Sequence, residues 1–427
     1  MPGRLLSVLC GLLIAPAWLG AQQTSPSTVD DLVRMGITRN KDLLSTRERV
    51  NEAQGAARQA GVRPPPTINA SGITGKPLGT LGQEQYGANY LQPIETFGKR
   101  SKRIEVARFG VGQAEAELQQ RSSELAYEIR AAVAERQAEE EKLKLLDELA
   151  SVNQDALRLT EARVREGDVA PLEAGLLRVE ISRAAVLKTS AQGRLAVAEA
   201  NLRKLAGLKA DEPLPQVAAE AQGSDTLDAL KARALQSRAD LRAALLKADQ
   251  ERAGIALAKA NALPDVSLSA GYSLQYSQFD GLFGQTSTGA LAPINERVDL
   301  LTFGVSIPLR TSRSGAGDVQ SAAARATGAQ LERQYLERSI PLEVEGAYQR
   351  WTAARASLDL LRTGVVEPSK ANLDVIREAY KLGQLRLLDV LNEQRQLVDT
   401  ELAYIDAQAD AARGWAEVER AIGGNLP

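Results

Sequence analysis

The sequence predicts a mainly α-helical, elongated protein with a small β part, and three observations support this class. Aromatic residues make up only 4% of the 427 residues, which is typical of long helices rather than of a compact aromatic core. Two stretches, 99–165 and 315–382, have a helical composition interrupted only by Pro341 and Pro368. Between the helical stretches lie segments in which apolar and polar residues alternate as they do in strands.

The first element is an N-terminal targeting segment. Arg4 precedes a run of nearly all apolar residues at 5–19, and small residues follow it. We interpret residues 1–21 as a secretory signal peptide, with cleavage after Ala21 or, alternatively, after Ala17. A membrane anchor is the other interpretation, but about 15 apolar residues are short for a helical span that needs about 20. We therefore expect an exported protein.

The composition excludes several classes of function. There is no histidine, and the one cysteine, Cys10, lies in the predicted signal peptide. A His/Cys zinc site, a Cys or His nucleophile and a disulfide framework are therefore excluded. We also predict no metal site, no cofactor and no enzymatic activity, on the further grounds given below. Lys and Arg number 52 against 54 Asp and Glu, which argues against a nucleic acid partner. Leu9 precedes Cys10 where a lipoprotein signal requires a small residue, so we expect no lipid anchor.

The rest of the chain is a tandem duplication of one order of elements. Residues 28–66 align without gaps on 226–264, and the offset between matching residues is larger after the strands, because the second hairpin carries an insertion. We expect a first repeat at 22–207, a linker at 208–224 and a second repeat at 225–424.

Each repeat is expected to contain a helix of about 35 residues, a β-hairpin and a long helical hairpin. The first helices of the two repeats are expected at 28–61 and 226–262. The β-hairpins are expected at 66–94 and 264–309, with surface loops at 74–85 and 278–297. The long helices are expected at 99–165 and 315–382, and each is followed by a turn, at Gly167 or Gly383, and a partner helix.

The strand-like segments are amphipathic and of the length that spans a membrane. Residues 265–277 place apolar side chains on one face and polar or small ones on the other. Segments of about 10–13 residues suit tilted membrane strands, and the hairpin regions hold about half of the aromatic residues, as aromatic girdles would. A small soluble sheet packed on the helices is the alternative. Because a membrane sheet cannot leave open edges and small barrels need about eight strands, four strands per chain require an oligomer, and three chains give twelve.

The sequence resembles the TolC-like outer-membrane factor family (outer membrane efflux proteins) over residues 28–424. The resemblance rests on the duplication and on the segments 263–268, 92–100 and 380–391, and Gly98-Lys99-Arg100 is similar to the heavy-metal (CzcC-like) branch. The family implies a homotrimer with a 12-stranded β-barrel in the lipid of the cell outer membrane and a long periplasmic α-barrel. It also implies a periplasmic adaptor protein and an inner-membrane pump, most typically of the RND type, for which the channel is a passive duct.

The resemblance also implies roles for residues near the helical turns. A carboxylate six residues after each turn glycine corresponds to Glu173 and Asp389, and three copies would form a negative ring that binds cations. Asp389 is expected about one and a half turns into the last helix, and Tyr380 is expected to hold the closed tip by bonding to Glu173. A solvated helix face is the alternative for the carboxylates. The implied pore or gate residues are Asp389, Glu173, Tyr380, Asn392 and Glu393, and the implied adaptor-contacting residues are Gly167, Val169, Leu172, Gly383, Leu385 and Leu388.

Two rival functions stay open at this point. A periplasmic adaptor of the same pumps is disfavoured because adaptors carry one helical hairpin and β-rich domains rather than two copies of hairpin and helices. A periplasmic enzyme or scaffold is disfavoured because no acidic pair lies in a cleft motif. Residues 139–141, three consecutive glutamates, are interpreted as a solvated helix face rather than a metal cluster, since consecutive helix positions do not face one another.

Overall fold

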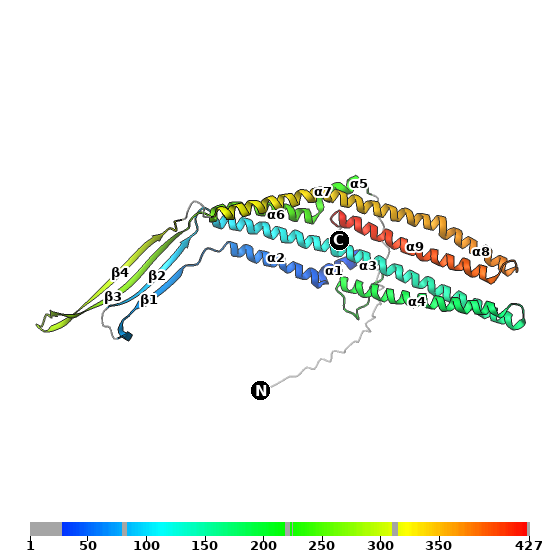
Figure 1. Ribbon diagram of the computed structural model, residues 1–427, viewed down its shortest axis with the longest axis horizontal. Helices are drawn as coiled ribbons and strands as arrows, with labels where there is room; N and C mark the ends of the chain where they lie inside the picture. Colours follow the sequence, from blue (N-terminus) through cyan, green and yellow to red (C-terminus); the bar gives the residue numbers. More distant parts are fainter. Residues whose placement is uncertain (1–27, 79–82, 218–222, 224, 310–314, 425–427) are drawn as a thin grey trace, which may run out of the picture.

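The computed structural model describes residues 28–78, 83–217, 223, 225–309 and 315–424. The predicted signal peptide at 1–21 lies outside the described residues, as does part of the predicted linker. A sheet occupies one end of the molecule and helices run from it along the long axis (Figure 1). Within the described ranges, no helix combines the length and apolar character that crossing a membrane requires.

The sheet has four antiparallel strands in the order of the sequence. They are β1 (Thr67–Ile73), β2 (Gln83–Ile94), β3 (Val266–Gln285) and β4 (Leu291–Ser306). The register aligns Ile68, Tyr90, Ala270 and Phe303 in one cross-strand row, while the next row contains Asn69, Asn89, Gly271 and Thr302. Because side chains of a strand alternate between faces, one face of the sheet is apolar and the other is polar, as the alternation predicts.

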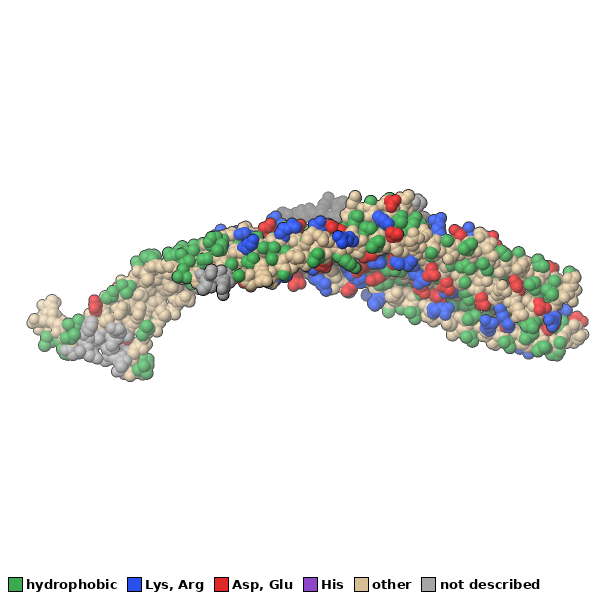
Figure 2. All heavy atoms as spheres, turned by 45° about the horizontal axis from the view of Figure 1, so that its top comes forward, with side chains coloured by type: hydrophobic (Ala, Val, Ile, Leu, Met, Phe, Trp, Pro, Cys, Tyr) green, Lys and Arg blue, Asp and Glu red, His purple; other side chains and the backbone are tan. Residues whose placement is uncertain are grey.

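Charged side chains are sparse on the sheet and dense on the helices. Figure 2 shows Lys, Arg, Asp and Glu side chains gathered over the helical part, with few over the sheet in that view. The apolar face of the sheet also leaves large side chains uncovered, among them Ile68, Phe303 and Val305, with exposed fractions of 66–79%. A sheet face of this kind requires an apolar environment that the chain itself does not supply.

The expected surface loops are shorter than the sequence suggests. The prediction of a loop at 278–297 is wrong, because β3 and β4 continue through most of it and leave a turn in which Thr286 N donates to Ala290 O at 2.8 Å. Before β2, a short 3₁₀-helix, η1, covers Lys76–Leu78. The hydrogen bonds of strand pairing outweigh the Gly- and Thr-rich local composition that favours a loop.

The helices form two successive curved layers, and two long helices, α3 and α7, contribute to both. Beside the sheet the packing order is α2–α3–α6–α7, and farther from the sheet it is α4–α3–α9, with α7 and then α8 packed on α9 (Figure 1). These helices are α2 (Lys41–Ala60), α3 (Lys99–Glu166), α4 (Pro171–Ala206), α6 (Ala239–Asn261), α7 (Ala316–Leu361), α8 (Glu367–Lys381) and α9 (Leu387–Ala421).

The prediction of one continuous helix at the start of each repeat is wrong in both repeats. The chain forms α1 (Val29–Arg39) before α2 and α5 (Leu227–Ser237) before α6, with Asn40 and Arg238 in extended conformation between them. Asn40 Nδ2 donates to Leu205 O at 2.9 Å, and Arg238 Nη1 donates to Ala421 O at 3.4 Å. Each break residue therefore binds the last turn of a partner helix, and this tertiary contact replaces the local helical bond.

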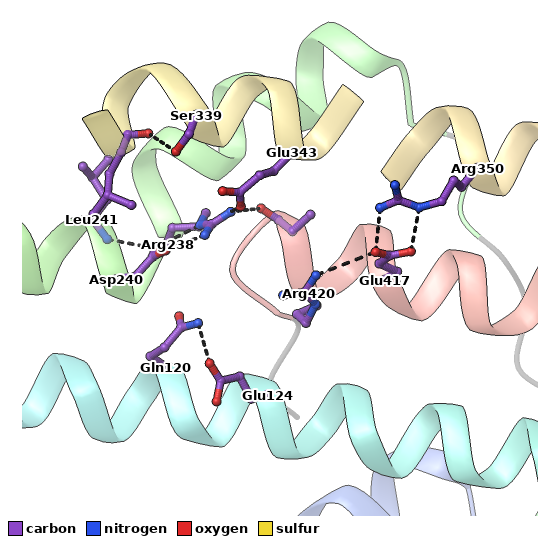
Figure 3. Close-up of polar contacts among 12 residues, drawn as sticks. Gln120, Glu124, Arg238, Asp240, Leu241, Ser339, Glu343, Arg350, Glu417 and Arg420 are labelled. Carbon is purple, nitrogen blue, oxygen red and sulfur yellow. Dashed lines mark hydrogen bonds and ion pairs between the residues drawn. The ribbon is translucent and has the colours of Figure 1, made fainter. Parts of the chain in front are cut away.

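Further contacts stabilise the same two breaks. Arg238 lies between the carboxylates of Asp240 and Glu343, with Glu343 at 2.6 Å, beside the end of α9 (Figure 3). Gly207, which follows α4, has a φ of +70°, and a Cβ there would lie 2.7 Å from the backbone carbon of Arg39. Only glycine fits a left-handed position so close to another backbone.

The long helix of the first repeat is unbroken, whereas that of the second is interrupted. The expected helix at 315–382 is α7 and α8 joined by a π-helical turn, η2 (Arg362–Val366). Pro368 has no amide hydrogen to donate four residues back, and Glu367 N instead donates to Arg362 O, five residues earlier. Pro341 is accommodated inside α7.

The solvated-face interpretation of the glutamates at 139–141 is wrong for Glu139, which is only 2% exposed. Its carboxylate binds Lys142 Nζ at 2.8 Å and Arg194 Nε of α4 at 2.8 Å, and Lys142 also binds Asp406 of α9 at 2.5 Å. Burial lowers the pKa of Lys142, but the bonds to Asp406 and Glu139 outweigh it and raise the pKa overall. These ion pairs join three helices, and no metal-holding cluster occurs among the described residues.

Candidate functional site

The end of the molecule far from the sheet is formed by two helical hairpins with the same turn. Gly167 after α3 has a φ of +85°, and Gly383 after α8 has a φ of +75°. In both turns the next residue donates back to the helix, Asp168 N to Arg163 O and Gln384 N to Ala379 O, each at 2.9 Å. No atom lies within 4 Å of a Cβ built at either glycine, so backbone conformation and not crowding favours glycine there.

Apolar side chains are exposed at both turns. Leu172 is 71% exposed in the first turn, and Leu385 and Leu388 are 36% and 41% exposed in the second. Val169, between Gly167 and Leu172 in the first turn, is half-buried. The two turns, which we call the tip, therefore present uncovered apolar groups at one end of the chain.

A hydrogen bond joins the two hairpins close to the tip. Tyr380 of α8 donates its hydroxyl to Glu173 Oε2 of α4 at 3.1 Å, the pairing that the family resemblance implies. Leu177 of α4 packs with Leu387 and Leu391 of α9 beneath it. Burial, followed by the nearby Glu173 carboxylate, raises the pKa of Tyr380, so the phenol stays protonated and can donate.

Two further contacts between the hairpins lie deeper and were not predicted. Arg395 Nε of α9 donates to Glu180 Oε1 of α4 at 2.9 Å, and this bond raises the pKa of Arg395. Gln394 Nε2 donates to Asn153 Oδ1 of α3 at 3.1 Å, and both side chains are buried. The sequence holds a signal for them, because Glu180 follows Glu173 by one heptad and Gln394 extends the core period of the last helix toward the tip.

The remaining predicted gate residues lie in or next to the first turns of α9. The expected depth of Asp389 is wrong, because α9 begins at Leu387 and Asp389 lies in its first turn. Its carboxylate accepts from Arg386 N at 3.0 Å, so it caps the helix as well as carrying a charge. Asn392 accepts from Arg395 Nη1 at 3.3 Å, and Glu393 is half-buried.

A sheet with one apolar face, joined to long helical hairpins that end in a tip, is the architecture of a channel-type membrane protein. The chain belongs to the family described as Outer membrane efflux protein, which matches residues 32–208 and 230–424. The Cobalt-zinc-cadmium resistance protein CzcC of Cupriavidus metallidurans is 24% identical over 414 residues, covering 94% of this chain and 91% of that protein.

Solved structures share the fold. A crystal structure of CusC aligns with a TM-score of 0.74 at 19% identity, covering 93% of this chain and 92% of that one. The outer-membrane channel OprN aligns with a TM-score of 0.73 at 20% identity, covering 93% and 90%. The chain is thus an outer-membrane efflux channel whose long helices form an α-barrel and whose strands contribute to a β-barrel. The comparisons do not favour a periplasmic adaptor.

Proposed function

We propose that three copies of this chain form the outer-membrane duct of a tripartite efflux system, with the tip as its gate. Proteins of this family work as trimers with an adaptor and an inner-membrane pump. The observation that carries the proposal is that every layer of the chain has two open edges: β1 and β4 in the sheet, α2 and α7 beside it, and α4 and α8 toward the tip. Three copies joined edge to edge close all three layers at once.

The edge helices carry the apolar stripes that such closure needs. Val179 and Val186 of α4 are 61% and 70% exposed, and Val375 of α8 and Leu382, the residue that follows α8, are 69% and 73% exposed. Each pair is spaced by seven residues, so each forms a stripe along its helix. In the trimer α4 of one copy packs on α8 of the next, and these stripes supply the contact.

Mass measurement in detergent tests the assembly. We expect three chains per particle for the wild type. Val186→Asp, which places a charge on the proposed stripe, should dissociate or weaken the trimer. Gln192→Asp, at an exposed position about 120° around the same helix from the stripe, should leave it intact. A monodisperse wild-type monomer contradicts the assembly.

At the tip, the bond from Tyr380 to Glu173 holds the second hairpin against the first and keeps the duct narrow. Opening separates α8 and α9 from α4, which requires breaking this bond in each copy. Three Asp389 carboxylates near the axis supply the negative ring that binds cations, beside Asn392 and Glu393.

The exposed apolar side chains of the tip are the surface for the periplasmic adaptor. Leu172, Leu385 and Leu388 project from the two turns at Gly167 and Gly383 and match the hydrophobic character of a helical-hairpin partner. An RND-type inner-membrane pump drives transport through that adaptor. Leu172→Asp should abolish cross-linking to the adaptor encoded with the channel while the trimer persists, and unchanged cross-linking would contradict this surface.

Metal cations are the cargo that the comparisons support best, because CzcC is a cobalt-zinc-cadmium resistance protein and matches over 94% of this chain. Cells lacking this chain should accumulate cobalt, zinc or cadmium and regain resistance when it is restored. Unchanged metal content with altered drug sensitivity would point to drugs as the cargo instead.

A further inference from the structure

The apolar face of the sheet ends at a row of charged and aromatic side chains. Among the paired strand residues on that face, the charged ones are Glu84, Arg297 and Asp299, and the register places them in two adjacent rows. Arg297 lies over the ring of Tyr276 at 5.9 Å and binds Asp299 at 3.3 Å. Tyrosines with charged groups at the end of an apolar band mark the surface of the bilayer.

Beyond that row, β3 and β4 are the only strands that continue among the residues the structure describes. Pairing between β2 and β3 ends at Gln83 with Ser277, whereas β3 and β4 are still paired at Gln285 with Leu291. From Arg297 to Leu291 the strand rises by about 20 Å at about 3.3 Å per residue. This β3–β4 ribbon therefore extends past the membrane surface into water, where a lone two-stranded hairpin is marginally stable.

The end of the ribbon is apolar on both faces. Phe283 and Leu291 are 60% and 74% exposed, and Leu282 and Ile294 are 55% and 41% exposed. Leu291 shares the face of Arg297, and Ile294 lies on the opposite face because side chains alternate. Apolar groups that lie beyond the lipid and are not covered by their own chain require a partner.

Three copies of the ribbon can reach one another. A barrel of twelve strands about 4.8 Å apart, tilted by about 40°, has a radius of about 12 Å. The ribbon is longer than this radius, and β4 is the edge strand at the contact between copies. A register shift between Gln278 and Phe283, at the base of the ribbon, supplies the bend that such irregularities introduce at barrel rims.

We propose that the three β3–β4 ribbons fold over the outer mouth of the duct and pack their apolar ends together around the threefold axis. This inference rests on the proposed trimeric duct. It adds a second closure of the duct, at the end opposite the tip. The apolar end of each ribbon is covered by the same segment of the other two copies.

Disulfide trapping tests the proposal, and the chain suits it because Cys10, its one cysteine, lies in the predicted signal peptide. Ile294→Cys places a thiol on the inward face of the ribbon in each copy. Oxidation of the detergent-solubilised trimer should give a reducible dimer on denaturing gels, containing at most two of every three chains. Asn295→Cys, the next residue on the opposite face, should give several-fold less dimer, and the unsubstituted chain should give none.

A second measurement reports the closure itself. In a background with Tyr380→Phe, which loosens the tip, oxidised Ile294→Cys channels should conduct less than reduced ones, and a reductant should restore the current. A trimer that conducts but gives no dimer and no change on oxidation overturns the ribbon closure and leaves the duct standing. A protein that is neither trimeric nor conducting overturns the duct itself.

Discussion

Removing the hydroxyl of Tyr380 is the most direct perturbation of the tip. Tyr380→Phe deletes the donor of the 3.1 Å bond to Glu173 and keeps the ring that packs near Leu177 and Leu387. Glu173 is half-buried, so water can solvate its carboxylate once the bond is lost. The substitution therefore removes one contact between the hairpins without leaving a buried charge unpaired.

The expected effect follows from the number of copies. One such hydrogen bond contributes about 0.5–1.5 kcal/mol. If the tip opens in all three copies together, the closed state loses about 1.5–4.5 kcal/mol relative to the open state, a shift of about 10-fold to about 1,000-fold in their ratio. The deeper contacts of Arg395 with Glu180 and Gln394 with Asn153 remain, so the thermal unfolding temperature should stay close to the wild-type value.

Planar-bilayer conductance of the purified trimer is the assay. Tyr380→Phe should conduct more than wild type, and adding Glu173→Gln should change little further because both substitutions remove the same bond. Tyr404→Phe is the matched control, since Tyr404 is a half-buried tyrosine of α9 in the same hairpin. Wild-type conductance in Tyr380→Phe, or an equal rise in Tyr404→Phe, would refute the assignment of this bond to the gate.

Three further predictions separate charge, backbone conformation and buried ion pairs. Asp389→Asn should weaken block by multivalent cations in conductance recordings, because it removes the charge and keeps an oxygen that can accept from Arg386 N. Asp389→Ala should also lower the unfolding temperature, because it loses that hydrogen bond at the start of α9, about 0.5–1.5 kcal/mol. Unchanged block in both variants would exclude the charge ring. Gly383→Ala should destabilise the trimer by about 1 kcal/mol, because the backbone φ at position 383 is +75°. Gly254→Ala, within α6, should be neutral or stabilising in the same thermal melt. Equal effects of the two substitutions would exclude the backbone explanation. Lys142→Met should lower the free energy of unfolding by about 1–3 kcal/mol at neutral pH. Lys144→Met, at an exposed position, should leave it almost unchanged. Because the pKa of Lys142 is raised above 10.5 in the folded protein, the wild type should lose this contribution to the free energy of unfolding as pH rises beyond 10.5. Lys142→Met should lose less stability over the same alkaline range. Parallel plots of stability against pH for the two proteins would contradict the ion-pair role.

The periodic features of the fold were accessible from sequence. Alternation over 265–277 predicted which face of the sheet is apolar, and the register bears it out. The long helix at 99–165 was placed within a residue or two, since α3 spans Lys99–Glu166. The turns at Gly167 and Gly383 follow from a residue type that favours positive φ. Each of these features depends on neighbours within a few positions.

Features that depend on residues far apart in the chain could not be predicted from the sequence. The breaks at Asn40 and Arg238 exist because their side chains bind carbonyls 165 and 183 residues away. From the sequence Glu139 is predicted to lie on a charged, solvated helix face. The structure shows that it is buried and paired with Arg194 and Lys142.

The sequence alone therefore determined the class of this protein: an outer-membrane chain with long helices, four amphipathic strands and a family resemblance that implies the pairing of Tyr380 with Glu173. Tertiary structure decided where those helices break, how far the β3–β4 ribbon continues beyond β2, and which polar groups join the two hairpins. The division has one physical cause. Periodicity and turn chemistry are local and visible in a short window, whereas ion pairs, caps on partner helices and strand register arise only when residues far apart in the chain meet.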